Sequence, residues 1–219
     1  MIKISTFYKK KPQYDSNEFR QNMLTYVNKA NQDPDINGYC VNFVNDVRTL
    51  NIDPVQMGYD ATSENWINLK DGIEPFHFQP KVKGIDIEQM CLRKTTFLTE
   101  EHIILKGPSV PTNLKLVVLL QRRSDLSANE WREWWLKHAQ LTAQMPGLRA
   151  YRINFISKAE NSYLEKLGIS FDGTAQLWFD SLADMESGFG SSIGKKASED
   201  SDNHCGKRAR FLTEEYCIV

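Results

Sequence analysis

The sequence lacks several features that would identify a class of partner. Its 219 residues carry 27 basic and 28 acidic side chains, so no excess of positive charge indicates a nucleic-acid or anionic-membrane partner. The longest apolar run, residues 116–120, is too short for a signal peptide or a membrane span. The four cysteines form no Cys-x-x-Cys pair, which predicts reduced thiols. These absences predict a soluble cytoplasmic protein.

Motifs of several enzyme classes are missing too. The sequence contains no Gly-rich phosphate loop, no Gly-x-Ser-x-Gly elbow, no His-Glu-x-x-His and no dinucleotide fingerprint. One adjacent pair of soft ligands, His204 and Cys205, has no partner at metal-binding spacing. It lies in the polar run 198–207, which we predict to be a solvated loop. We therefore predict no metal site.

What the chain does contain is an internal repeat. Residues 97–105 read Phe-Leu-Thr-Glu-Glu-His-Ile-Ile-Leu, and residues 211–219 read Phe-Leu-Thr-Glu-Glu-Tyr-Cys-Ile-Val. Up to about residue 74 the two halves align without a gap at an offset of 112, so that Pro34 meets Pro146 and Trp66 meets Trp178. Hydrophobic residues make up 41% of the chain, enough for each half to bury a core.

Each half reads as the same series of elements. Strands are predicted at 2–9, 36–44, 62–69 and 97–105, with a helix at 16–31; in the second half strands are predicted at 114–122, 148–156, 174–179 and 211–219, with helices at 128–145 and from about 181. Asp15 with Glu18, and Ser127 with Glu130, have capping-box spacing. Pro75 predicts that the second helix of the first half is broken or shifted.

The order βαββαβ, repeated, predicts an α+β fold of two tandem ferredoxin-like units. A single such unit leaves one sheet face exposed, so we expect the two to pack sheet to sheet as an intramolecular dimeric α/β barrel. The expected domains are 1–106 and 114–219, joined by a Pro/Gly-rich linker at 107–113. This describes a monomer with a pseudo-twofold axis; further homodimerisation stays open.

The second half resembles the EthD family of the dimeric α/β-barrel superfamily. The resemblance rests on an aromatic-rich helix with His138, on Pro146-Gly147 followed by Tyr151, and on the terminal Phe211-Leu-Thr-Glu-Glu segment. It implies an enzyme acting on a small oxygenated cyclic or aromatic molecule without a cofactor. Decarboxylation, dehydration, isomerisation and cofactor-free oxygenation are the reactions implied. Because one fold hosts many functions, a non-catalytic small-molecule binding module is an alternative. The superfamily also includes haem enzymes. A haem-binding protein with His138 or His102 as the axial ligand is therefore an alternative.

His138 is the leading catalytic candidate. It lies on the apolar stripe of its helix, where burial would keep the imidazole neutral and able to act as a general acid or base. A hydrogen-bonded core histidine is the alternative interpretation. The first half has Tyr26 at the matching position, so it is interpreted as a structural copy, or as a second pocket in which Tyr26 donates a hydrogen bond.

Other candidates are less specific. Tyr151 could donate a hydrogen bond to a substrate oxygen, although its match with Tyr39 favours a structural role. Asp172 could orient an imidazole or form a turn before Gly173. Trp178 is a substrate-binding candidate or a core residue. Three tryptophans of one helix could stack on a flat ring: Trp131, Trp134 and Trp135. His77 and His102 are further possible site residues.

Overall fold

The computed structural model describes residues 2–50, 57–68, 74–77, 80, 82–107, 114–160 and 162–218. We call residues 2–107 the first unit and 114–218 the second. The first unit contains β1 (Ile2–Lys10), α1 (Ser16–Ala30), β2 (Ile36–Leu50), β3 (Ala61–Ile67), the 3-10 turn η1 (Pro75–His77), α2 (Ile87–Met90) and β4 (Cys91–Leu105). The second contains β5 (Leu114–Arg122), α3 (Ala128–Thr142), β6 (Leu148–Glu160), α4 (Ser162–Lys166), β7 (Gly173–Phe179), α5 (Leu182–Gly190), α6 (Ser192–His204) and β8 (Cys205–Ile218). Apart from Gly107, the predicted linker lies outside the described residues.

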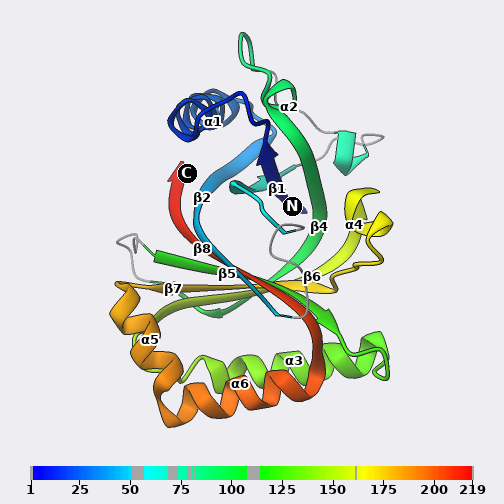
Figure 1. Ribbon diagram of the computed structural model, residues 1–219, viewed down its shortest axis with the longest axis vertical. Coiled ribbons are helices and arrows are strands. Elements are labelled where there is room, and N and C mark those ends of the chain that lie inside the picture. The colour runs from blue at the N-terminus through cyan, green and yellow to red at the C-terminus, as the bar shows by residue number, and fades with distance from the viewer. Residues whose placement is uncertain are drawn as a thin grey trace.

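The eight strands form one closed barrel in the order β1-β3-β2-β8-β5-β7-β6-β4. Each unit contributes four neighbouring antiparallel strands, and the long strands β8 and β4 join the units by pairing with β2 and β6. Figure 1 shows α1 and α2 at one end of the barrel and α3, α5 and α6 at the other. The predicted α+β fold and intramolecular barrel are confirmed, with the two sheets joined edge to edge.

Strand alternation sorts side chains into inner and outer layers, because successive residues point to opposite faces. In β5, Leu116 and Val118 face the helices of the second unit, whereas Val117 and Leu119 belong to the core inside the barrel. The six residues from Lys115 to Leu120 are all buried, as predicted for a strand covered on both faces. The described residues thus form three hydrophobic cores, one under each set of helices and one inside the barrel.

The predicted capping box is complete at the start of α3, and the start of α1 shows the first of its two hydrogen bonds. In α3 the Ser127 hydroxyl accepts from the Glu130 amide at 3.2 Å, and the Glu130 carboxylate accepts from the Ser127 amide at 2.8 Å. In α1, Asp15 accepts from the amide of Glu18 at 2.8 Å. The predicted disruption around Pro75 agrees with the described residues of this segment, which form η1 and the one-turn α2 where the second unit has α5 and α6.

Two predictions are wrong. The run 198–207 is no loop, since α6 continues to His204 and β8 begins at Cys205. Cys40 and Cys217 are not reduced thiols but form a disulfide, with Cα atoms 4.1 Å apart. They are directly opposed where β2 pairs with β8, a contact between units that local sequence spacing cannot reveal. Cys91 and Cys205 are free, as predicted.

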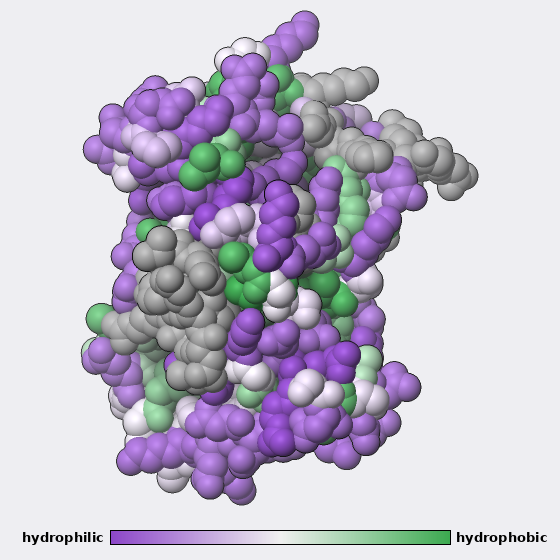
Figure 2. Space-filling view, turned by 45° about the vertical axis from the view of Figure 1, so that its right-hand side comes forward, coloured by the Kyte–Doolittle hydropathy of each residue, from purple (hydrophilic) through white to green (hydrophobic). Residues whose placement is uncertain are grey.

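The visible surface is mainly hydrophilic. On the face in Figure 2, hydrophobic residues form small separate patches among polar side chains. Large exposed hydrophobics in the described part of the chain are Leu92, Ile103 and Leu182. None of the described helices is both long and apolar enough to cross a membrane.

Candidate active site

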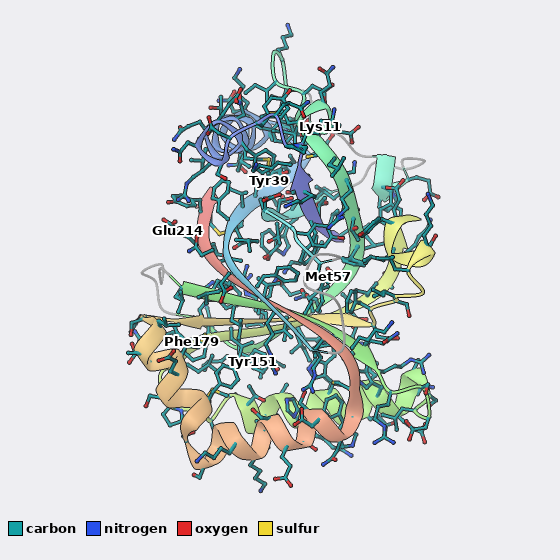
Figure 3. The ribbon with its side chains drawn as sticks, in the orientation of Figure 1. Lys11, Tyr39, Met57, Tyr151, Phe179 and Glu214 are labelled. Atoms are coloured by element: carbon teal, nitrogen blue, oxygen red, sulfur yellow. A yellow bond between two sulfur atoms is a disulfide. The ribbon has the colours of Figure 1, made fainter. Side chains whose placement is uncertain are left out.

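A small cavity lies in the second unit, between the outer face of the sheet and helices α3, α5 and α6. Its volume is about 70 Å³. Its walls include the residues Leu116, Leu120, Trp134, Trp135, His138, Thr142, Tyr151, Leu177, Phe189, Ser198, Arg208 and Arg210. In Figure 3 the Tyr151 side chain occupies this layer between the barrel and the helices.

His138 forms a hydrogen-bonded pair with Asp200. Its Nδ1 lies 2.7 Å from Asp200 Oδ2, and its Nε2 lies 3.1 Å from the Thr142 hydroxyl oxygen. The His138 side chain is only 9% exposed. Burial lowers its pKa below the usual 6.5, although Asp200 opposes that shift through its hydrogen bond and charge. Near pH 7 the imidazole is therefore neutral, with the Nδ1 proton donated to Asp200 and a lone pair on Nε2.

Helix α6 positions Asp200 against α3. The carboxylate also accepts from Trp134 Nε1 at 3.0 Å, and His204, one turn further, stacks on the Trp134 ring with centroids 4.5 Å apart. Asp200 was missed because its segment was interpreted as a loop. The repeat contained the missing signal, since at an offset of 114 Asp86 and Cys91 match Asp200 and Cys205.

Three other predicted residues surround the same cavity. Trp134 and Trp135 line it from α3, and Tyr151 lines it from β6. Burial raises the pKa of Tyr151, with Trp135 and Thr142 opposing the shift, so its hydroxyl stays protonated and can donate a hydrogen bond. Trp131 packs behind this wall, with its ring centroid 4.6 Å from that of Trp135.

The last strand adds a cation that sequence reasoning missed. Arg210 of β8 lines the His138 cavity and an adjoining cavity of about 290 Å³, which also share Leu116, Phe189 and Ser198. Neighbouring Arg208 pairs with Asp202, whereas Arg210 forms no hydrogen bond or ion pair with any described residue. Burial and Arg208 lower the pKa of Arg210, and Asp202 opposes them. The guanidinium is thus available to an anion entering the cavity.

The structure places the remaining candidates elsewhere. Asp172 accepts from the Arg122 amide at 2.9 Å and from its Nε at 3.0 Å, away from the cavity wall, which corrects the proposed role as orienter of the imidazole. Trp178 lies inside the barrel and Tyr26 lines a cavity in the first unit, so neither reaches a ligand beside His138. His102 pairs with Glu100 on β4. The side chain of His77 lies outside the described residues.

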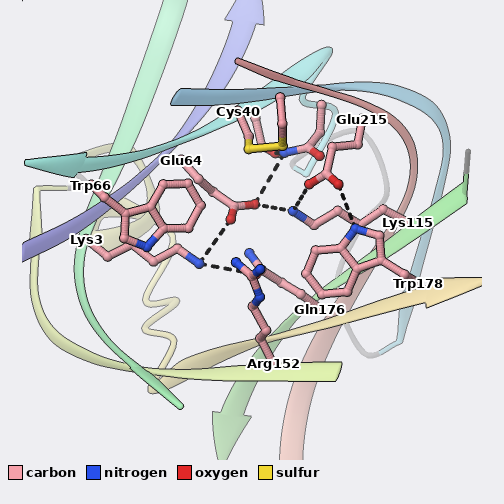
Figure 4. Close-up of a disulfide and its surroundings, with 12 residues drawn as sticks. Lys3, Cys40, Glu64, Trp66, Lys115, Arg152, Gln176, Trp178 and Glu215 are labelled. Carbon is pink, nitrogen blue, oxygen red and sulfur yellow. Dashed lines mark hydrogen bonds and ion pairs between the residues drawn. A yellow bond between two sulfur atoms is a disulfide. The ribbon is translucent and has the colours of Figure 1, made fainter. Parts of the chain in front are cut away.

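A second polar cluster occupies part of the inside of the barrel (Figure 4). Lys115 pairs with Glu64 and Glu215, and Lys3 pairs with Glu64 at 3.0 Å and Glu101 at 2.6 Å. Burial raises the pKa of Glu64, but the two ammonium groups outweigh it, so the pKa is lowered and the carboxylate stays charged. Each of these charges has an ion-pair partner, so the cluster offers no free charge to a substrate, and we interpret it as structural.

The cluster contains the same tryptophan-to-glutamate hydrogen bond in both units. Trp66 Nε1 donates to Glu101 at 3.2 Å, and Trp178 Nε1 donates to Glu215 at 2.7 Å. Arg152, which pairs with Glu101 at 3.4 Å, is an exception. It has no counterpart in the first unit, because Cys40 occupies the matching position.

Comparison with known proteins agrees with this architecture. An anthrone oxidase-like protein shares the fold with a TM-score of 0.64 at 13% identity, covering 99% of this chain and 92% of that one. A candidate monooxygenase from Lactobacillus acidophilus NCFM has a TM-score of 0.61 at 9% identity, covering 100% and 95%. A mutant chlorite dismutase from Candidatus Nitrospira defluvii has a TM-score of 0.51 at 7% identity, covering 97% and 90%.

Sequence comparison is informative for the second unit. No curated protein matches the chain. The family model described as the EthD domain matches residues 123–207, which include α3, α6, His138 and Asp200. The resemblance inferred from the helix and the Pro-Gly stop is therefore confirmed there: residues 123–207 of the second unit are similar to the EthD domain.

Proposed function

We propose that the protein is a cofactor-independent enzyme that acts on a small, oxygenated, anionic ring compound, with His138 as its general base. The observation that carries the proposal is the His138–Asp200 pair at the wall of a cavity. A buried neutral imidazole, held in one tautomer by a carboxylate, can remove a proton from a carbon or phenol acid. Such a base contributes typically about 10²–10⁴ in rate.

The substrate displaces the Thr142 hydroxyl from Nε2 of His138 in this proposal. Loss of the substrate proton leaves an enolate or phenolate, and protonated Tyr151 donates a hydrogen bond to its oxygen. Arg210 binds a carboxylate or similar anionic group at the junction of the two cavities. A cavity of roughly 150 Å³ accepts benzene in another protein, so the His138 cavity alone is too small and the ring must extend into the adjoining 290 Å³.

An oxidation is the reaction favoured for the resulting anion. Two proteins of the same fold are named as oxidase-like and as a candidate monooxygenase, which supports an oxidoreductase over a lyase or isomerase. An electron-rich enolate or phenolate is also the form of such a substrate that reacts with molecular oxygen. The names of distant relatives support the reaction type only, so the substrate class rests on the residues of the cavity.

A haem site does not fit the described residues. Beside His138 the cavity is about 70 Å³ and the adjoining cavity about 290 Å³, which leaves no room for a haem macrocycle on Nε2. His102 is held by Glu100 and lies 3.3 Å from Arg132, whose positive charge opposes a metal on the same nitrogen. We therefore derive no step through haem.

The test is turnover by the parent and by His138→Ala and His138→Gln, on a panel of ring carboxylic acids that carry a phenol or an enolisable carbonyl group. Oxygen consumption and mass spectrometry of the products are the readouts. Both variants should keep the parent's circular dichroism and lose about 10²–10⁴ in kcat/KM. Tyr26→Phe, at the matching position of the first unit, is the control and should retain activity.

Other outcomes would reject the proposal in distinct ways. Undiminished turnover by His138→Ala excludes a catalytic imidazole. Failure of both His138 variants to fold would show a core histidine. Binding of ring acids by the parent with no chemical change over long incubation would favour a non-catalytic binding module.

A further inference from the structure

Two cavities of unequal size meet beside helix α5. The cavity at His138 has a volume of about 70 Å³, and the adjoining cavity has about 290 Å³. Four residues line both cavities and form the junction between them: Leu116, Phe189, Ser198 and Arg210. Because a benzene ring occupies a cavity of roughly 150 Å³ in another protein, a ring fits the larger cavity and approaches His138 only through the junction.

Phe189 is the bulky, movable side chain of the junction. Leu116 is 6% exposed and is held in β5 between two neighbouring strands, Ser198 is small, and Arg210 is the anion-binding group of the proposed function. Phe189 lies in the last turn of α5, is half-buried, and has its ring centroid 6.2 Å from that of Phe179. Its ring therefore has a packed neighbour on one side and cavity space on two others.

The backbone at Phe189 is held where α5 meets α6 (Figure 1). A Cβ added at Gly188 would lie 2.6 Å from the Pro146 carbonyl oxygen, and one added at Gly194 would lie 2.6 Å from the Phe189 Cα. The chain thus packs against itself on both sides of Phe189 with no side chain between. An aromatic side chain in a helix has two common χ1 rotamers, which direct its ring differently. Any change in the width of the junction therefore falls to the Phe189 ring.

We propose that Phe189 determines which ring compounds reach His138, by setting the width of the junction. The inference rests on the proposed function, which supplies the ring acid and its anchor at Arg210. With the anionic group on Arg210, the ring lies beside Phe189, because both residues line the junction. A single ring passes the Phe189 side chain, whereas the second ring of a fused pair collides with it. Phe189 is thus a specificity-determining residue and takes no part in proton transfer.

Titration calorimetry on the full chain with salicylate and 3-hydroxy-2-naphthoate tests the proposal. Both acids carry adjacent hydroxyl and carboxylate groups, and they differ by one fused ring. Phe189→Ala should shift the ratio of the two Kd values about tenfold in favour of the naphthoate, because the truncated side chain leaves room for the second ring. Phe189→Trp should shift the ratio in the opposite direction, since the larger side chain narrows the junction.

Leu182→Ala is the matched control. Leu182 lies on the same helix, is 43% exposed, and is not part of the wall of either cavity, so this variant should keep the parent's ratio. Circular dichroism checks that each variant folds. Should Phe189→Ala fail to fold, Phe189→Leu takes its place and should give a smaller shift in the same direction.

Several results would overturn the proposal: an unchanged ratio in the folded Phe189 variants, a shift in the same direction for alanine and tryptophan, an equal shift in Leu182→Ala, or binding of neither acid by the parent. The readout is binding and not turnover. A protein that binds with this selectivity but shows no turnover would therefore reject the proposed catalysis alone. Turnover that depends on His138, with an unchanged ratio in the Phe189 variants, would reject the role of Phe189 alone.

Discussion

In the second unit the Trp135 ring lies over Gly173, whereas the first unit has Met23 and Ala61 at the same two positions. A Cβ added at Gly173 would meet Trp135 at 2.2 Å. The large Trp135 ring therefore requires glycine at position 173. In the first unit the smaller Met23 side chain leaves room for the Cβ of Ala61. The same backbone thus supports two differently shaped spaces under its helices, and the differences between units are substitutions made in compensating sets.

The comparison extends to the polar groups. Asp200 holds a histidine in the second unit, while the matching Asp86 caps a helix turn near Tyr26. Inside the barrel, by contrast, the lysines and tryptophans are matched in both units. The two units therefore keep the same polar residues inside the barrel, where they meet. They differ in chemistry in the layers between the sheet and the helices.

The largest effect on stability is expected from the matched lysines. Lys115→Met removes a fully buried cation from Glu64 and Glu215, and we expect a loss of about 3–5 kcal/mol, as when one partner of a buried pair is deleted. Lys3→Met should cost less, because Glu101 keeps Arg152. Chemical denaturation of both variants measures the difference; equal losses would show that Arg152 does not compensate.

A smaller effect should follow from exchanging the packing of the two units. Gly173→Ala crowds the Trp135 ring and the Asn154 carbonyl, and we expect about 1–3 kcal/mol of destabilisation, as in other overpacked cores. Adding Trp135→Met, which copies Met23 beside Ala61, should recover part of that loss. Denaturation of the single and double variants gives the coupling energy. Strictly additive losses would contradict compensating packing.

The smallest effect concerns pH. His138 must be neutral to accept a proton, so kcat/KM should fall as pH decreases through its pKa, which burial places below 6.5. The groups facing it are Asp200, Thr142, Trp134 and, more distantly, His204. Asp200→Asn removes the charge that raises this pKa, so the acidic limb should move to lower pH. A limb that stays in place would mean that Asp200 is not charged or that another group titrates.

The sequence by itself determined the repeat, the order of elements, the caps of α1 and α3, the break at Pro75 and the EthD resemblance. These features depend on local periodicity and on residues a few positions apart, which one chain displays directly. The sequence also identified Trp134, Trp135, His138 and Tyr151 as candidate site residues, and all four line one cavity.

Only the tertiary structure decided which of the candidates meet. Closing the barrel through β2–β8 and β4–β6 brought Cys40 to Cys217 and directed Trp178 inward. Packing α6 across α3 brought Asp200 to His138, from a segment that reads as solvent-exposed because most of its residues are polar. Such contacts join residues 62 to 177 positions apart, and they depend on how strands and helices pack rather than on any pattern within one element.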